Sequence, residues 1–290
     1  MLRLSVFKNP AFKNPAFKNR AFNILGFKKS TRGFTLIEMI AVIVILSILA
    51  AMGGTFVVES TKSYQLSQTR TRLVNTGRQA IERMSRQLRI ALPNSVRLTN
   101  SNMCVEFMPI ASGGNYLGHF QNANYKEDYV PDALNGASPA DILVVSPHEI
   151  EFGTAQFVSI GAMAATEVYG VNPGSRAALG SRTNTQLTLA AARVWQRNSV
   201  NKRFYLLNAP HAFCVVNNEL RFYDNQDATS AAVDLSSSYS LLAANVVATA
   251  PFALTAGAEN RNTLVQFTIA FAHKAESVAF NHSVMIRNVP

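Results

Sequence analysis

Hydrophobic residues follow three patterns along the chain, and the first is an almost unbroken apolar run. Residues 34–58 comprise 25 positions, of which Glu38 is the only charged one. A helix of this length extends roughly 37 Å, more than the hydrocarbon core of a bilayer, which is about 30 Å thick. The apolar core of a secretory signal peptide is shorter, about 7–15 residues. The run therefore predicts a membrane-spanning helix.

The second pattern is amphipathic and extends the same helix beyond residue 58. Apolar residues recur at three-, four- and seven-residue spacings, which is typical of a helix with one buried face. Pro93 predicts that the helix ends just before it. We expect one long helix over about 34–92, with its second half, 59–92, packed under a globular head. The apolar positions are Leu66, Leu73, Ala80, Ile81, Met84, Leu88 and Leu92.

Arginines fill other positions of this amphipathic segment and allow two interpretations. They could form a stripe that contacts DNA, or a solvated helix face. No aromatic residues interleave with them, so the solvated face is favoured. The six residues are Arg70, Arg72, Arg78, Arg83, Arg86 and Arg89.

The third pattern covers residues 93–290 and is β-rich. Strand-like stretches are "MCVEFMPI", "DILVVS", "RFYLLN", "AFCVVNN" and "ELRFYD", and "TLVQFTIAFA" with "ESVAFNHSVMI" predicts a hairpin. "SLLAANV" predicts a short helix, whereas 112–140 and 161–200 resemble long loops. Nearly 200 residues can bury one core. The fold class is therefore α+β, a long N-terminal helix packed on a β-rich head.

The pair Gly53-Gly54 interrupts the apolar run with two weak helix formers, each costing about 1 kcal/mol relative to Ala. Two interpretations are equally favoured. Small residues allow close helix packing in a membrane. The same pair could also melt locally and serve as a hinge when the chain leaves the bilayer.

The charge of the chain is concentrated before the apolar run. Residues 1–33 contain eight basic residues and no acidic one, which accounts for +8 of the formal net charge of +10. The positive-inside tendency keeps such a segment in the cytoplasm and sends the remainder across the membrane. We interpret 1–33 as a basic leader. The remaining residues carry nearly equal numbers of basic and acidic side chains. The high isoelectric point of the whole chain is therefore weak support for nucleic-acid binding.

Glu38 is a lone carboxylate near the start of a membrane helix, where a charge needs a partner or a reason. If the chain is cut between Gly33 and Phe34, the new amine of Phe34 lies one helical turn from Glu38. Glu38 could neutralise that amine in its own chain or in a neighbouring one. The alternative is an interfacial Glu38 that reaches the lipid headgroups or inserts protonated.

The sequence around this residue, "KKSTRGFTLIEMIAVIVILSILAA", closely resembles the processing site of type IV prepilins. The resemblance implies cleavage after Gly33 by a membrane prepilin peptidase and N-methylation of Phe34. It also implies that Glu38 engages the amino terminus of an adjacent subunit and sets the register of assembly.

Further blocks resemble a minor-pilin family of the mannose-sensitive haemagglutinin (MSHA) pilus, namely "MSRQLRIALPNSVRL", "CVEFMPIASGGNYLGHF" and "RFYLLNAPHAFCVVNNELRFY". This resemblance implies a non-catalytic subunit that helps to initiate or cap a pilus. Its implied partners are other major and minor pilins, prepilin peptidase, the inner membrane and the assembly platform, with no nucleic acid. The implied location is the inner membrane with a periplasmic head, then the pilus at the cell surface.

Two other classes of protein remain open. One is a minor pseudopilin of type II secretion, of the J type. The other is an extracytoplasmic binding protein or enzyme held by a plain signal anchor, which would keep its leader.

The two cysteines, Cys104 and Cys214, each lie in a strand-like stretch on the predicted periplasmic side. That compartment is oxidising, so a disulfide is favoured over two separate thiols. Closing a loop of about 110 residues would stabilise the head by about 4–5 kcal/mol in the chain-entropy interpretation.

Motifs of catalysis do not occur in the sequence, which has no G-x-S-x-G, H-E-x-x-H or phosphate loop. We expect no enzyme activity, no cofactor and no metal. Each of the five histidines is favoured as a surface or core residue rather than a ligand. Residues 223–227, "YDNQD", predict a polar turn in preference to a calcium site.

Overall fold

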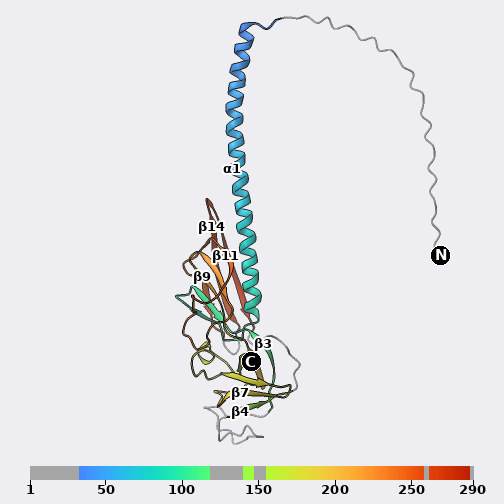
Figure 1. Ribbon diagram of the computed structural model, residues 1–290, viewed down its shortest axis with the longest axis vertical. Coiled ribbons are helices and arrows are strands. Elements are labelled where there is room, and N and C mark those ends of the chain that lie inside the picture. The colour runs from blue at the N-terminus through green and yellow to red at the C-terminus, as the bar shows by residue number, and fades with distance from the viewer. Residues whose placement is uncertain (1–32, 118–139, 147–154, 258–260, 288–290) are drawn as a thin grey trace, which may run out of the picture. The chain divides into compact units, whose positions relative to one another are not determined.

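A computed structural model describes residues 33–117, 140–146, 155–257 and 261–287 (Figure 1). The predicted leader, apart from Gly33, lies outside these residues. By its internal contacts the chain divides into two units, Met1–Val58 and Glu59–Pro290. The α+β layout predicted from the sequence is confirmed, because one long apolar helix is followed by a β-rich head.

Helix α1 spans Leu36–Arg89. It ends four residues before Pro93 because the backbone of the following residues pairs with another segment. Leu92 N–H donates to the carbonyl of Met108 at 2.8 Å, and Ile110 N–H donates to the carbonyl of Ile90 at 2.8 Å. These bonds turn the chain into the head before proline would stop the helix.

The second half of α1 buries the face predicted from the periodicity. Its spacing of three and four residues places one stripe against the head, which Figure 1 shows beside β9, β11 and β14. Leu66 is an exception, because it stays on the exposed part of the helix. The buried residues are Leu73, Gly77, Ala80, Ile81, Met84, Ser85 and Leu88.

A five-stranded antiparallel sheet has the order β1-β2-β9-β10-β11. The tight turn between β9 and β10 is formed by Asn217 and Asn218, with φ of 51° and 63°, as a two-residue hairpin requires. The bounds are β1 Arg97–Thr99, β2 Cys104–Phe107, β9 His211–Val216, β10 Glu219–Tyr223 and β11 Ser240–Ala244.

A second sheet is built on β14, which pairs with β12 and β13 and, along its whole length, with β15. The predicted C-terminal hairpin is confirmed as β14–β15. The predicted helix "SLLAANV" is wrong, because pairing with β10 and β14 overrides the helix propensity of Leu and Ala. The bounds are β12 Val246–Val247, β13 Phe252–Thr255, β14 Thr263–His273 and β15 Glu276–Ile286.

A third sheet of six strands has the order β3-β8-β5-β6-β7-β4. It contains strands where 161–200 was expected to be a loop. The start of the other expected loop, 112–140, belongs to β3, and residues 118–139 of it lie outside the described part of the chain. Buried side chains such as Ala177, Leu187 and Leu189 explain these strands, although small residues obscure their pattern. The bounds are β3 Ile110–Asn115, β4 Ala140–Val144, β5 Phe157–Ser159, β6 Arg176–Arg182, β7 Gln186–Arg193, β8 Arg203–Leu207 and a 3-10 turn at Ala165–Glu167.

The apolar interior is divided rather than forming the one core expected. The largest cluster joins the second half of α1 to the first two sheets. A separate cluster fills the six-stranded sheet around Tyr116, Trp195 and Phe204. Smaller clusters lie around Met108 and around the disulfide. The helix therefore stabilises only part of the head directly.

Candidate functional site at the start of the long helix

The first turn of α1 is closed by a reciprocal capping arrangement between Thr35 and Glu38. The hydroxyl of Thr35 accepts a hydrogen bond from the N–H of Glu38 at 3.3 Å. In return, Glu38 Oε2 accepts from the N–H of Thr35 at 2.9 Å and from its hydroxyl at 3.0 Å. This is a capping box, which satisfies donors that a helix start leaves open.

The capping box was missed in the sequence, although its signal, Thr-x-x-Glu directly before an apolar run, is present at 35–38. The capping box gives Glu38 a structural role within its own helix. The carboxylate already has local partners for Oε2, while the structure gives Oε1 no partner among the described residues. Glu38 can therefore stabilise its own helix and still offer an acceptor to a second molecule.

Every polar side chain in the apolar half of α1 is hydrogen-bonded within the helix itself. Ser47 donates to the carbonyl of Ile43 at 2.7 Å, and Thr55 donates to the carbonyl of Met52 at 2.9 Å. With Thr35 and Glu38, these are all the polar side chains of the 34–58 run. Such internal pairing suits a segment in lipid, where unsatisfied polar groups cost several kcal/mol.

The apolar side chains of this half are exposed on all sides of the helix. Leu46 and Leu49, one turn apart, are each 58% exposed. By length and composition, α1 is long and apolar enough to cross a membrane. A helix that is hydrophobic all round requires a membrane or other helices around it. A methyl group added at Gly53 or Gly54 would meet nothing within 4 Å.

Gly33 and Phe34, the residues of the predicted cleavage, precede the first turn in exposed, non-helical conformation. A side chain added at Gly33 would likewise meet nothing within 4 Å. The structure thus places the predicted cleavage and methylation positions directly before the capping box. Cys104 and Cys214 lie in the head.

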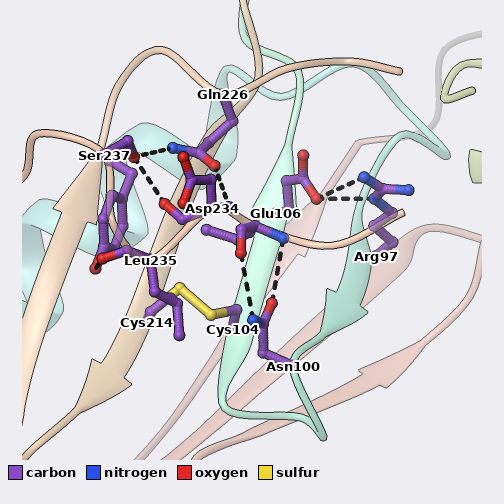
Figure 2. Close-up of a disulfide and its surroundings, with 11 residues drawn as sticks. Arg97, Asn100, Cys104, Glu106, Cys214, Gln226, Asp234, Leu235 and Ser237 are labelled. Atoms are coloured by element: carbon purple, nitrogen blue, oxygen red, sulfur yellow. Dashed lines mark hydrogen bonds and ion pairs between the residues drawn. A yellow bond between two sulfur atoms is a disulfide. The ribbon is translucent and has the colours of Figure 1, made fainter. Parts of the chain in front are cut away.

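The structure contains a disulfide between Cys104 and Cys214 (Figure 2). The two residues are direct partners in the β2–β9 register, with Cα atoms 4.1 Å apart. Both are fully buried, in a small cluster with Tyr223 and Val233. The bond links β2 to β9, the central strand of the same sheet.

The segment 224–239 joins β10 to β11 and lies beside this disulfide (Figure 2). Asn100 binds both backbone groups of Val233, at 3.3 and 3.2 Å. Gln226 accepts from the N–H of Asp234 at 2.7 Å and donates to Ser237 at 2.7 Å. Side-chain hydrogen bonds therefore hold an irregular segment in place.

Two carboxylates of the head, one buried and one half-buried, pair with arginines, and sequence reasoning missed both pairs. Glu106 is fully buried and pairs with Arg97 at 2.8 Å, and burial raises the pKa of Glu106 although Arg97 opposes the shift. Glu167 pairs with Arg197, at 2.8 Å between Oε1 and Nη2. Burial acts to raise the pKa of Glu167, but hydrogen bonds from Arg197 and the Met163 N–H outweigh it and lower that pKa.

Three of the six arginines of α1 contact side chains of the same helix or of the head. Arg70 lies 3.8 Å from Glu276, and Arg86 lies 3.2 Å from Glu82. The guanidinium of Arg83 stacks over Phe222, 5.3 Å from the ring centre. These contacts agree with a solvated face.

The residues considered for metal binding take part in ordinary structure. Asp227 accepts from the N–H and hydroxyl of Thr229 at 2.8 Å, which makes the end of 223–227 a polar turn. His211 packs against Phe107 and Phe222, and burial lowers its pKa. Among the described residues, no three His, Cys, Asp or Glu side chains are grouped to hold a metal ion. His119 and His148 lie outside them.

The family described as the prokaryotic N-terminal methylation motif matches residues 28–54. Neither a curated protein nor a solved structure matches the chain. The match covers the predicted cleavage position, the capping box and most of the exposed apolar helix. It supports a type IV pilin-like protein, a pilin or pseudopilin subunit anchored in a membrane. It points to a structural subunit rather than an enzyme.

Proposed function

We propose that the chain is a non-catalytic minor pilin of the MshO type in an MSHA pilus, where it helps to initiate or cap assembly. Prepilin peptidase removes residues 1–33 and methylates the amine of Phe34. Before assembly, the protein is held in the inner membrane with its head in the periplasm. The assembly platform brings it together with other pilins.

One observation carries this proposal: the methylation motif coincides with the start of an apolar helix that has no partner for its surface among the described residues. In a membrane, lipid covers that surface. In a fibre, the helices of neighbouring subunits replace the lipid. The blocks that resemble MSHA minor pilins add the finer assignment.

Glu38 has a specific task in this proposal. Its Oε2 remains engaged by Thr35, which fixes the carboxylate at the helix start. Its Oε1 accepts a hydrogen bond from the methylated amine of Phe34 in a neighbouring subunit. A charge pair that is shielded from water is stronger than one at a surface. The pair therefore sets how far one helix slides along another.

Mass spectrometry of the N-terminal peptide from membrane-isolated protein tests the processing. We expect a peptide that begins at N-methylated Phe34. A retained leader contradicts the proposal and favours a plain signal anchor with an extracytoplasmic head.

Three variants separate the two tasks of Glu38. Glu38→Gln keeps a capping side chain but removes the charge, Glu38→Ala removes both, and Thr35→Val removes the capping hydroxyl with little change of shape. We expect Glu38→Gln and Glu38→Ala each to lower the share of the chain in sheared pili by about tenfold, the effect of ~1.4 kcal/mol. Thr35→Val should lower it less.

Near-normal incorporation of Glu38→Gln would show that capping, not charge, is what matters at this position. The Phe34 peptide is measured in every variant, so that failed processing is not mistaken for failed assembly.

Fractionation separates the pilus from the secretion alternative. A minor pilin is expected in sheared pili, and its deletion should reduce pilus number. A deletion that leaves pili unchanged and blocks protein secretion would instead identify a pseudopilin.

A further inference from the structure

The edge strands of the three sheets differ sharply in length and regularity. Five of them, β1, β3, β4, β11 and β13, have between three and six residues. The longer ones, β3, β4 and β11, also pair through a shift in register. Strand β15 has 11 residues and pairs with β14 without any shift.

The outer side of β15 lacks the features that usually protect an edge. Natural edge strands are short, bulged, charged, interrupted by proline or covered. Residues 277–286 contain no Asp, Glu, Lys, Arg, Pro or Gly. Within the described part of the chain, β14 is the only strand that pairs with β15.

The apolar core is also incomplete along the first part of this strand, although Val284 and Ile286 near its end are buried. On β14, the inward-facing Val265, Phe267, Ile269 and Phe271 are at most 1% exposed. Their direct partners on β15 include Val278 and Phe280, which are only partly buried, and His282, which is exposed. A further strand beside β15 would cover these positions, just as β15 covers those of β14.

We propose that the free edge of β15 binds an extended segment of a different protein chain, which adds a strand to this sheet. The repeating N–H and C=O groups of an edge are matched only by another extended backbone. The partly buried side chains of Val278 and Phe280 select a segment of alternating apolar and polar residues, with its apolar side chains on the helix-facing side. The absence of charge on 277–286 selects a segment without charged residues in its centre.

A second copy of β15 fits this edge poorly. Glu276 lies near Arg70, and Phe280 lies against Gly77, so β15 runs in the same direction as this part of α1. An antiparallel pair of β15 strands would point these parts of the two helices in opposite directions. In the proposed function the subunits align their helices in one direction, so this exclusion, unlike the rest of the inference, rests on the proposed function. A parallel pair would appear in the crosslinking test as adducts with a second copy.

Site-specific photocrosslinking in cells that produce the full chain tests the proposal. The probe is benzoylphenylalanine, placed in turn at Ala279, Asn281 and Ser283, which lie on the exposed face of β15. Neighbouring strands bring side chains of the same face within about 4.5–5.5 Å. We expect adducts with one other protein, mapping to positions two residues apart in a single segment. A probe at Thr268, on the central strand β14, should give none.

Two matched substitutions test whether the edge itself is responsible. Gln266 and Ser283 are direct partners on the exposed face of β14 and β15. We expect Ser283→Lys to reduce the adduct from the probe at Ala279 by about tenfold, because lysine on an edge opposes strand addition. Gln266→Lys adds the same charge to the central strand and should leave the adduct unchanged.

Three results overturn the inference. The first is the absence of adducts from protein whose intact Cys104–Cys214 bond shows that the head is folded. The others are adducts with a second copy and equal effects of Ser283→Lys and Gln266→Lys. The N-terminal peptide is measured in the same sample. Methylated Phe34 without adducts overturns this inference alone. Mapped adducts on a chain that keeps its leader overturn the proposed function alone.

Discussion

The two halves of α1 belong to one helix but differ in where their apolar side chains find partners. In the first half, Leu46 is 58% exposed and no described residue of its own unit covers it. In the second half, Met84 and Leu88 are fully buried against strands of two sheets. Burial of a leucine or methionine side chain is worth about 1.5–3 kcal/mol. The second half gains this energy within its own chain, and the first half has to gain it from lipid or neighbouring helices.

The glycines of the two halves of α1 differ in the space around them. Gly53 and Gly54 have open space around them, so a neighbouring molecule can approach the backbone closely. Gly77 is required by its own head, because a Cβ atom there would lie 2.3 Å from the Phe280 ring. Glycine thus lies at an open surface in one half and at an internal contact in the other.

Truncation of one leucine in each half is the strongest test of this comparison. Leu88→Ala should lower the free energy of unfolding of the head by about 2–5 kcal/mol, because it leaves a cavity in the largest cluster. Leu46→Ala should leave it unchanged. Guanidinium unfolding of the full chain in detergent, followed by the circular dichroism of the sheets, measures both. A similar loss in Leu46→Ala would mean that the head depends on the apolar half.

Alanine in place of glycine gives a smaller and more selective effect. Gly77→Ala gains helix propensity but forces the Phe280 ring to move, and overpacking costs about 1–3 kcal/mol. We expect a net loss of head stability in the same unfolding experiment. Gly54→Ala has open space and should only strengthen the helix, by about 1 kcal/mol. Equal midpoints for the two variants would contradict the close fit at Gly77.

The two longest kinds of element were predicted from one side-chain period that continues over many residues. The 3.6-residue spacing of Leu73, Ala80 and Leu88 identified α1, and the alternation of Val278, Phe280 and Val284 identified β15. Strand β11 was predicted as a helix because Leu and Ala favour helices locally. Its pairing with β10 depends on a partner that the local pattern does not contain.

Within the candidate site, Gly33, Phe34 and Glu38 are predicted from the motif alone, and their roles stay predictions. The capping role of the Thr35 hydroxyl was missed, although the Thr-x-x-Glu spacing of a capping box is present in the sequence. The buried pair Arg97–Glu106 could not be found, because its environment comes from distant parts of the chain. Arg97 also donates to the carbonyl of Ser230, 133 positions away in the sequence. Only the fold brings such groups together.

Removal of one charge from the interface between α1 and β15 should have the smallest effect. Arg70 and Glu276 lie 3.8 Å apart, and the arginine side chain is 67% exposed. Glu276→Gln should therefore lower the free energy of unfolding by less than about 1 kcal/mol. The difference should shrink in 1 M salt, where the Debye length is about 3 Å. Glu82→Gln, which breaks the more exposed pair with Arg86 on the same helix, is the matched control. If Glu276→Gln approached the effect of Leu88→Ala, charge rather than apolar burial would hold the second half of α1 to the head, and the comparison of the two halves would fail.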